Sequence, residues 1–468
     1  MIRTPLSKRE FAAHLFVPFC FGLYLTLFPL SQKLLFADSA SYIYFSELRS
    51  LAYPLFLNII RFISSELISI AYAQIWLFAL SIFFLSLAIR KVSSNNWFGV
   101  FISLSLCLNP YSVNLHFQIL PQSFLISLNL LMLSCLIYSF AKARLRCLFS
   151  FGLFIGLIIS TAPIGWAYLA LLSFASPLIA QQNNCSRLKA FSIPLCAALL
   201  VVTFESATYS ALHPNAETSL LPAQLFAKTS LMDAKEPSSY AKNDPRTKIW
   251  HMVENDLVSV RTIIWDAPSF ATRNDFLMRY ETFLTTSFAQ DHINSASDIL
   301  EKSKDDIRMD VASSRIIQNP AAFLEIAFEH YRALWTLQAN DHPSDVKQVN
   351  EYREKNAPYP LITHEKLPQK ADSLTMLQQP VLYGFWLLSF LTLLFGLFAM
   401  INRVPFNILF STSFICALLL HAQTSWIALT SVGTPQMMLA LSPLLIIGSI
   451  SLILSFYCAF FSPIRTDR

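Results

Sequence analysis

Long apolar runs alternate with short polar segments in residues 1–211 and again in residues 380–468, whereas residues 212–379 are polar and mixed in charge. A helix needs about 20 apolar residues to cross a bilayer. The pattern predicts an all-α polytopic membrane protein with transmembrane helices 1–7 in 1–211, one mainly helical domain in 212–379 and helices 8–10 in 380–468. The predicted crossings lie at about 11–35, 67–89, 97–114, 120–140, two within 147–181, 190–211, 380–400, 405–427 and 437–460.

Two apolar stretches do not fit single crossings. Residues 147–181 have room for two short legs, and Pro163 and Gly165 predict a turn between them. Residues 51–66 are apolar but contain two charged side chains, one of them Arg61. We therefore expect 51–66 to form a helix that lies in the membrane interface on the outer face.

Basic residues indicate the orientation, because Lys and Arg concentrate at the cytoplasmic ends of membrane helices. Clusters occur at the N-terminus, at Arg90 and Lys91, around Arg144, and at Arg187 and Lys189. Ten crossings satisfy every cluster and place both termini in the cytoplasm. Of the 34 Lys and Arg residues, 13 then lie at cytoplasmic ends and 3 in short outer segments. The domain 212–379 is therefore expected to be extracytoplasmic.

Within that domain, helical spacing predicts helices over 298–317 and 320–338, the second beginning at a proline. The second helix is either an amphipathic core helix or a helix lying on the membrane over a lipid-entry cleft. Residues 340–372 are rich in charge and proline, which predicts a mobile loop.

The composition supports a membrane protein, with 54% hydrophobic residues, 13% charged residues and a mean hydropathy of +0.48. Soluble domains carry about 25% charged residues, so this chain cannot coat a soluble globule of its size. The net charge of +5 comes without a basic tract interleaved with aromatics, and nucleic acid is not an expected partner.

The positions of the cysteines, the histidines and the glycosylation sequon bear on disulfide bonding, metal binding and the type of membrane. None of the eight cysteines lies in 212–379, so no disulfide framework is expected there. No histidine spacing matches a metal motif, and a divalent metal cofactor is left open without ligands to name. The single Asn-X-Ser/Thr sequon, at Asn184, lies on the predicted cytoplasmic side, which favours a bacterial inner membrane.

Candidate chemistry lies in the first outer loop, residues 36–66. Asp38 directly follows the first crossing, where its carboxylate could accept a proton from an acceptor hydroxyl. The alternative is a helix cap or a solvated loop residue. Arg49 or Arg61 could neutralise a phosphate. Glu205 lies inside a predicted crossing near its outer end, where an acid is either functional or reaches the interface.

This loop resembles the first outer loop of the GT-C glycosyltransferases, specifically the bacterial family 39-like group. That group is similar to protein O-mannosyltransferases and to the aminoarabinose transferase of lipid A. Its pattern is an Asp soon after the first span, an aromatic residue, and then Arg or His before a YPLFL-like run. Asp38, Tyr42, Arg49 and the run 53–57, which begins at Tyr53, match it.

Two later segments agree with the resemblance. Residues 316–324 followed by 330–335 resemble the helix before the late spans, and 435–443 resembles the closing segment. The chain also departs from the pattern. Ser39 stands where relatives often have a second acid, Gln122 replaces another acid, and arginines are missing at Ala162 and in 433–436.

The resemblance implies a GT-C-like fold and an inverting, hexosyltransferase-like enzyme. Its donor would be a sugar on a polyprenyl phosphate, and its acceptor an envelope glycan, lipid or protein. Asp38 would be the catalytic base. The candidate substrate- and phosphate-binding residues are Arg49, Tyr42, Glu47, Arg61 and Tyr53, followed by the weaker candidates Glu205, His330 and Arg332.

Other classes of membrane protein also fit the pattern. An envelope-glycan polymerase or ligase has many spans and a large outer loop as well. A transporter or a non-catalytic membrane protein is the other alternative. Transporters commonly use paired Gly- or Pro-broken helices in repeated halves, whereas this chain has nine glycines and no visible repeat.

Overall fold

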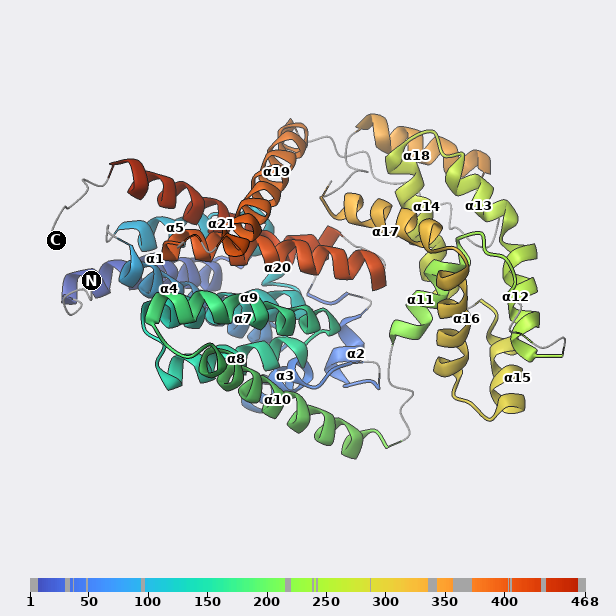
Figure 1. Cartoon of the computed structure of the whole chain (residues 1–468), viewed down its shortest axis with the longest axis horizontal. Helices are drawn as coiled ribbons and strands as arrows, with labels where there is room; N and C mark the ends of the chain where they lie inside the picture. Colours follow the sequence, from blue (N-terminus) through green and yellow to red (C-terminus); the bar gives the residue numbers. More distant parts are fainter. Residues whose placement is uncertain are drawn as a thin grey trace. The chain divides into compact units, whose positions relative to one another are not determined.

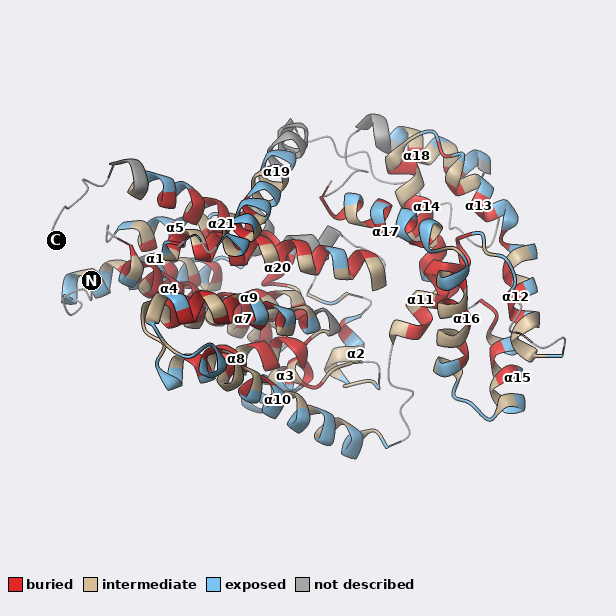
Figure 2. Ribbon diagram, viewed as in Figure 1, coloured by how far each residue is buried: buried red, intermediate tan, exposed pale blue. Residues whose placement is uncertain are grey.

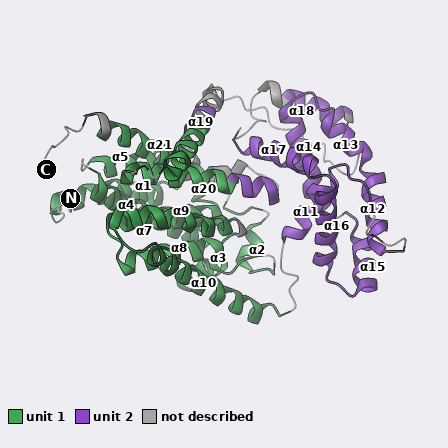
Figure 3. Cartoon of the chain, in the orientation of Figure 1, with its two compact units in different colours: residues 1–214, 385–423, 439–468 green, residues 215–384, 424–438 purple. Residues whose placement is uncertain are grey.

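A computed structural model describes residues 7–29, 34–36, 38–47, 49–93, 97–214, 220–237, 240, 243–286, 288–335, 343–356, 373–402, 404, 406–430 and 435–461. Every secondary-structure element within these ranges is a helix (Figure 1). This confirms the all-α class that the apolar pattern predicts. The described chain divides into two compact units (Figure 3).

Unit 1 comprises residues 1–214, 385–423 and 439–468. Among the residues that the structure describes, seven helices are long and apolar enough to cross a membrane. They are α1 (Lys8–Leu27), α4 (Ile68–Val92), α7 (Pro121–Ala141), α10 (Arg187–Leu212), the part Tyr383–Ile401 of α19 (Ser373–Ile401), α20 (Ile408–Thr430), and the part Ala440–Cys458 of α21 (Pro435–Phe461). A membrane protein is therefore supported by length and composition, and ten crossings remain a prediction.

Shorter helices occupy the other apolar stretches of unit 1. They are α2 (Ser39–Ile43), α3 (Ala52–Ile63), α5 (Trp97–Cys107), α6 (Pro110–Leu115), α8 (Leu145–Ile159), the 3₁₀ turn η1 (Pro163–Trp166) and α9 (Ala167–Asn183). The turn expected near Pro163 and Gly165 is η1. The stretch expected to be interfacial contains α3, which has 12 residues and is too short to cross a bilayer.

The helices of unit 1 differ in how far their side chains are buried, with some inside the helix bundle and others at its periphery (Figure 2). In α7 and α20, 72% of the most apolar window is buried, against 22% in α1 and α10. Large apolar side chains are exposed on the outer helices, such as Phe16 on α1 and Phe204 on α10. Hydrocarbon would solvate these faces, since a water-soluble domain rarely exposes so continuous an apolar surface.

Close backbone packing joins α8 to α10. A Cβ atom placed on Gly152 would lie 2.0 Å from the Pro194 carbonyl oxygen, and one on Gly156 would lie 2.8 Å from that of Ala198. Small residues four apart let two helices approach closely in a membrane. The Gly152/Gly156 face therefore brings α8 into close contact with α10.

Unit 2 comprises residues 215–384 and 424–438. Its helices are α11 (Leu220–Ser230), α12 (Pro245–Asp256), α13 (Val258–Trp265), α14 (Phe270–Thr286), α15 (Gln290–Leu300), α16 (Lys304–Gln318), α17 (Pro320–Trp335) and α18 (Pro343–Asn356), with the last turn of α20. Apolar residues of α11 to α17 form one core, which includes Trp250, Phe276 and Val311.

Two sequence expectations for unit 2 are wrong. The single helix expected over 298–317 is two helices, because Glu301 adopts a left-handed conformation that ends α15 and Ser303 caps α16 through the Asp306 amide. Part of the expected loop 340–372 is helix α18, which docks through Arg353 onto Asp275 of α14. Residues 340–342 and 357–372 lie outside the described ranges.

The helix expected over 320–338 is α17, which begins at Pro320 as predicted and is described to Trp335. Phe323 and Ile326 pack in the core of unit 2, which confirms the amphipathic core-helix interpretation. Its other face exposes Leu324 and Phe328, and the membrane-lying alternative for that face remains a prediction.

Candidate functional site

Asp38 and Arg49 form an ion pair within the loop 36–66 of unit 1. The Arg49 Nη2 atom lies 2.9 Å from the Asp38 Oδ1 atom, and the side chains are 17% and 68% exposed. Asp38 occupies the position before α2, yet its side chain makes no capping hydrogen bond. The carboxylate is thus held by the guanidinium and open to solvent, and the simple cap interpretation does not describe it.

The Arg49 guanidinium is oriented by further contacts. Its Nε donates to Ser41 Oγ at 2.8 Å, and its Nη1 donates to the Tyr42 hydroxyl at 3.1 Å. Its central carbon lies 4.4 Å from the centre of the Tyr42 ring. Three separate nitrogens therefore bind three loop side chains, which fixes the plane of the fork. Such a planar donor set suits phosphate oxygens.

Beneath this pair, Tyr42 meets Tyr53 of α3 edge-on, with ring centres 5.4 Å apart. Tyr53 is fully buried, and its hydroxyl donates to the Gln74 side-chain oxygen at 2.8 Å. The Gln74 amide in turn donates to the carbonyls of His116 and Gln118. Burial raises the pKa of both tyrosines above the ordinary value. Both phenols are therefore neutral supports rather than bases at physiological pH.

Ser39 anchors the same loop to the segment before α7. Its hydroxyl is fully buried and donates to the Ile119 carbonyl at 2.9 Å, while it accepts from the Phe36 amide at 2.9 Å. A second carboxylate at this position would lack that donor and would face a carbonyl oxygen. The departure from the resembled pattern at Ser39 therefore has a structural use in this chain.

Helix α10 holds the second half of the loop. The Leu51 amide, at the start of α3, donates to Glu205 Oε1 at 3.2 Å, and the Tyr209 hydroxyl donates to the Glu47 carbonyl. The first amides of a helix lack intrahelical partners. Glu205 supplies one from another helix, which explains an acid near the end of an apolar segment. Glu47 takes part through its backbone, and its side chain is exposed.

The remaining sequence candidates have other partners. Arg61 is exposed on α3, and its Nη1 donates to the Ile43 carbonyl at 3.3 Å. His330 and Arg332 belong to α17 of unit 2. Arg332 lies over the Phe270 ring, 4.1 Å from its centre. His330 instead points into the core, where it contacts Lys228 and Glu281.

Sequence reasoning missed several of these partners. Ser41 and Gln74 belong to no sequence motif. Lys228 is the one charged residue of the apolar helix α11, a signal that the sequence prediction overlooked.

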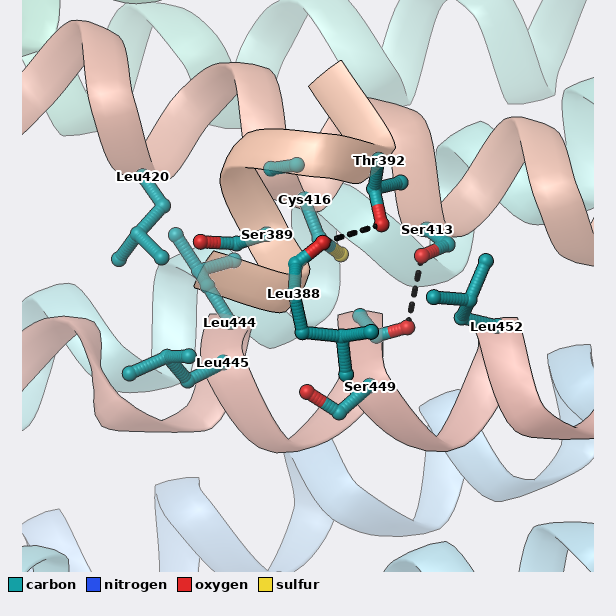
Figure 4. Close-up of a pocket in the computed structure, with 12 residues that line it drawn as sticks. Leu388, Ser389, Thr392, Ser413, Cys416, Leu420, Leu444, Leu445, Ser449 and Leu452 are labelled. Carbon is teal, nitrogen blue, oxygen red and sulfur yellow. Dashed lines mark hydrogen bonds between the residues drawn. The ribbon is translucent and has the colours of Figure 1, made fainter. Parts of the chain in front are cut away.

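A small pocket occurs in unit 1, between α19, α20 and α21 (Figure 4). Its lining includes Ser389, Thr392 and Ser449, and its volume of about 10 Å³ fits about one water molecule. Neither Asp38 nor Arg49 lines it.

Within the described ranges, no group of three His, Cys, Asp or Glu side chains is placed to hold a metal ion. Compared with known proteins, the chain matches no protein-family model, no curated protein and no solved structure. What the loop does must therefore be inferred from its own geometry.

Proposed function

We propose that this chain is an integral membrane glycosyltransferase that transfers a sugar from a polyprenyl phosphate to an envelope glycan, lipid or protein. The observation that carries the proposal is the Asp38–Arg49 pair on its tyrosine support. It brings a solvent-accessible carboxylate and an oriented guanidinium into one loop. These are the two groups that an inverting displacement on a lipid-phosphate sugar requires.

The proposed topology has ten crossings, both termini in the cytoplasm of a bacterium and unit 2 outside. Contacts between helix ends support this orientation. Arg90 at the end of α4 pairs with Glu10 at the start of α1 at 2.7 Å, and Lys91 lies 5.5 Å from the ring centre of Tyr138 near the end of α7. The Asn183 amide at the end of α9 donates to carbonyls of that same α7 end. Basic clusters thus gather at one end of unit 1.

The first outer loop belongs to the opposite helix ends. The Ala52 amide, at the start of α3, donates to the Ser160 carbonyl at the end of α8, and α8 begins beside the basic cluster at Arg144. Leu51 contacts α10 near its C-terminal end, whereas the basic residues of α10 are at its start. If the basic helix ends lie in the cytoplasm, Asp38 lies on the opposite side of the membrane. On that side the sugar donor is a lipid-linked sugar, not a cytoplasmic sugar nucleotide.

In the proposed reaction, the donor phosphate competes with Asp38 for the Arg49 guanidinium. The freed carboxylate accepts the proton of an acceptor hydroxyl as the hydroxyl oxygen attacks the anomeric carbon. The bond from that carbon to the phosphate oxygen breaks, and the lipid phosphate leaves with its electron pair beside Arg49. The products are an inverted glycoside, a polyprenyl phosphate and a protonated Asp38, which returns its proton to water.

The decisive experiment is Asp38→Asn, assayed as purified protein in liposomes with a polyprenyl-phosphate sugar donor. Loss of the base should slow transfer by about 10²- to 10⁴-fold, while thermal stability changes by about 0.5 kcal/mol or less. Glu351→Gln is the matched control, because Glu351 is also an exposed acid paired with a cation, Lys347, at 3.7 Å. Transfer by the Asp38→Asn protein at the rate of the control would exclude Asp38 as the base.

A further inference from the structure

Three ionisable side chains from three helices meet in the interior of unit 2. They are Lys228 of α11, Glu281 of α14 and His330 of α17, and none is more than 2% exposed. The Lys228 Nζ atom lies 2.9 Å from His330 Nδ1, and His330 Nε2 lies 3.0 Å from Glu281 Oε1. Lys228 Nζ is 4.0 Å from the other Glu281 oxygen. We call these residues the Lys–His–Glu array.

The geometry of the array sets its proton count. A contact of 2.9 Å between Lys228 Nζ and His330 Nδ1 is a hydrogen bond only if one nitrogen donates and the other accepts. On its other side, the imidazole Nε2 atom lies beside the Glu281 carboxylate, in ion-pair contact with Oε1. The array then carries one positive and one negative charge, whichever nitrogen of the pair bears the shared proton. With a second proton, Lys228 and His330 would both be cations and both nitrogens would be donors. Their contact would then be repulsive.

The array also binds the C-terminal end of a helix. Lys228 Nζ donates to the Ala428 carbonyl at 2.7 Å, and Ala428 is in the last turn of α20, which ends at Thr430. The last four carbonyls of a helix have no intrahelical partner, and a cation there is favoured by the helix dipole. Lys228 therefore fastens the last turn of α20 to the core of unit 2.

Other charged groups on the packed helices have partners of their own. On α17 itself, Glu329 pairs with Arg273 of α14 at 3.0 Å, and Arg332 is exposed. On α16, Arg315 pairs with Glu254 at 2.6 Å. Of the described residues, Glu281 is the carboxylate that contacts both nitrogen-bearing side chains of the array. A second proton on the array would thus leave a net positive charge in the core.

We propose that the Lys–His–Glu array is an acid-sensitive latch that holds the last turn of α20 in unit 2. Near neutral pH, the shared proton closes the chain of contacts from Glu281 to the Ala428 carbonyl. In acid, a second proton drives Lys228 and His330 apart, and the Lys228 ammonium leaves the carbonyl for water. Burial lowers the pKa of Lys228, which adds to the cost of keeping both nitrogens protonated inside.

Hydrogen exchange of full-length protein in lipid nanodiscs tests the latch without any assumption about catalysis. Amide protection of residues 426–430, corrected for the intrinsic pH dependence of exchange, should fall at least tenfold between pH 7.5 and pH 4.5. In His330→Gln, protection should not change with pH, because a glutamine can accept from Lys228 and donate to Glu281 but cannot take up a proton.

Glu329→Gln is the matched control, since Glu329 neighbours His330 on the same helix but pairs with Arg273. It should keep the pH response of the natural protein. Lys228→Met supplies a second, independent variant: the last turn should exchange rapidly at both pH values. A natural protein whose 426–430 protection is constant over the range overturns the latch. So does a tenfold acid response that persists in Lys228→Met, and both outcomes remain readable if His330→Gln fails to fold.

Discussion

The two units use polar side chains in different ways. In the described part of unit 1, the ion pairs Asp38–Arg49 and Glu10–Arg90 lie at helix ends, and the interior is joined by hydroxyls and amides. In unit 2, some ion pairs also lie in the core, as with Arg353 and Asp275, which are 2% and 1% exposed. Unpaired charge is costly in either medium, but hydrocarbon offers no water with which to solvate a pair that separates.

The buried arginines of unit 2 show what charge accomplishes there. Arg315 binds the Thr229 and Met232 carbonyls, and Arg261 binds those of Ser230 and Val253. The first three of these carbonyls belong to the end of α11 and the turn after it. Charged donors thus replace water at a buried helix end. In unit 1, several serine hydroxyls bond within their own helix, as Ser134 does to the Leu130 carbonyl.

The largest expected effect comes from breaking one of these buried ion pairs. Arg315→Met removes one of the two arginines that pair with Glu254, Arg261 being the other. It also leaves the Thr229 and Met232 carbonyls without this donor. Burial lowers the pKa of Arg315 only to about 10, so the side chain is charged at pH 7. We expect a loss of about 2–5 kcal/mol, mainly from the two buried carbonyls, measured by thermal unfolding in detergent.

Arg308→Met on the same helix is the control for this change. Arg308 pairs with Asp305 at 3.1 Å, one turn away on the same helix, and both side chains are partly exposed; local pairs of this kind contribute about 0–1 kcal/mol. Equal losses in the two variants would contradict the distinction between buried and partly exposed pairs.

A smaller effect is expected from crowding the packed membrane helices. Gly152→Leu must displace the Pro194 carbonyl, which would lie 2.0 Å from the new Cβ. Overpacking of this kind costs about 1–3 kcal/mol. Gly384→Ala is the control, because no atom lies within 4 Å of its Cβ position. Unfolding of both variants in the same detergent measures the difference, and an unchanged Gly152→Leu protein would contradict the close α8–α10 contact.

A weaker change removes one hydroxyl from the polar interior of unit 1. Tyr168 of α9 donates to the Asn129 side chain of α7 and accepts from Gln423 of α20. Bonds of this kind between membrane helices contribute about 0.6 kcal/mol on average. We expect Tyr168→Phe to lose about that amount in detergent unfolding. Ser105→Ala, which removes an exposed bond within one helix, should change stability less.

The sequence predicted the helices of unit 1 better than those of unit 2. Apolar length locates α4, α7 and α10, because hydrocarbon thickness sets the run of residues independently of neighbours. In unit 2 the break at Glu301 and the helix α18 depend on a left-handed residue and on a distant ion pair. Neither leaves a periodic pattern in the chain.

The candidate site divides in the same way. Asp38, Tyr42 and Arg49 are close in sequence, and a local pattern could predict that they belong together. Gln74 and Glu205 reach the loop from distant helices, and their contacts depend on packing. A lone acid near the end of an apolar helix does signal a function or a partner, and Glu205 proves to have a partner, the Leu51 amide.

The smallest expected effect concerns a carboxylate at the start of α12 in unit 2, Asp244. It caps α12 through the Arg246 amide and pairs with the Arg246 guanidinium at 2.6 Å. The hydrogen bond from that guanidinium lowers the pKa of Asp244 below its ordinary value. The unfolded chain then binds the proton more readily than the folded one, so this stabilisation is present above about pH 4 and is lost as the pH falls further.

Asp244→Asn keeps a capping side chain but cannot titrate. Its stability should be lower than that of the natural protein at pH 6 by about 0.5 kcal/mol, the scale of a solvent-screened pair. The gap between the two proteins should narrow from pH 6 to pH 3, because protonation begins to remove the charge of Asp244 as the pH falls toward its lowered pKa. Melting temperatures of both proteins at the two pH values measure the difference. A gap that stays constant from pH 6 to pH 3 would mean that Asp244 stabilises α12 through the shape of its side chain alone. The charge of Asp244 would then contribute no measurable stability.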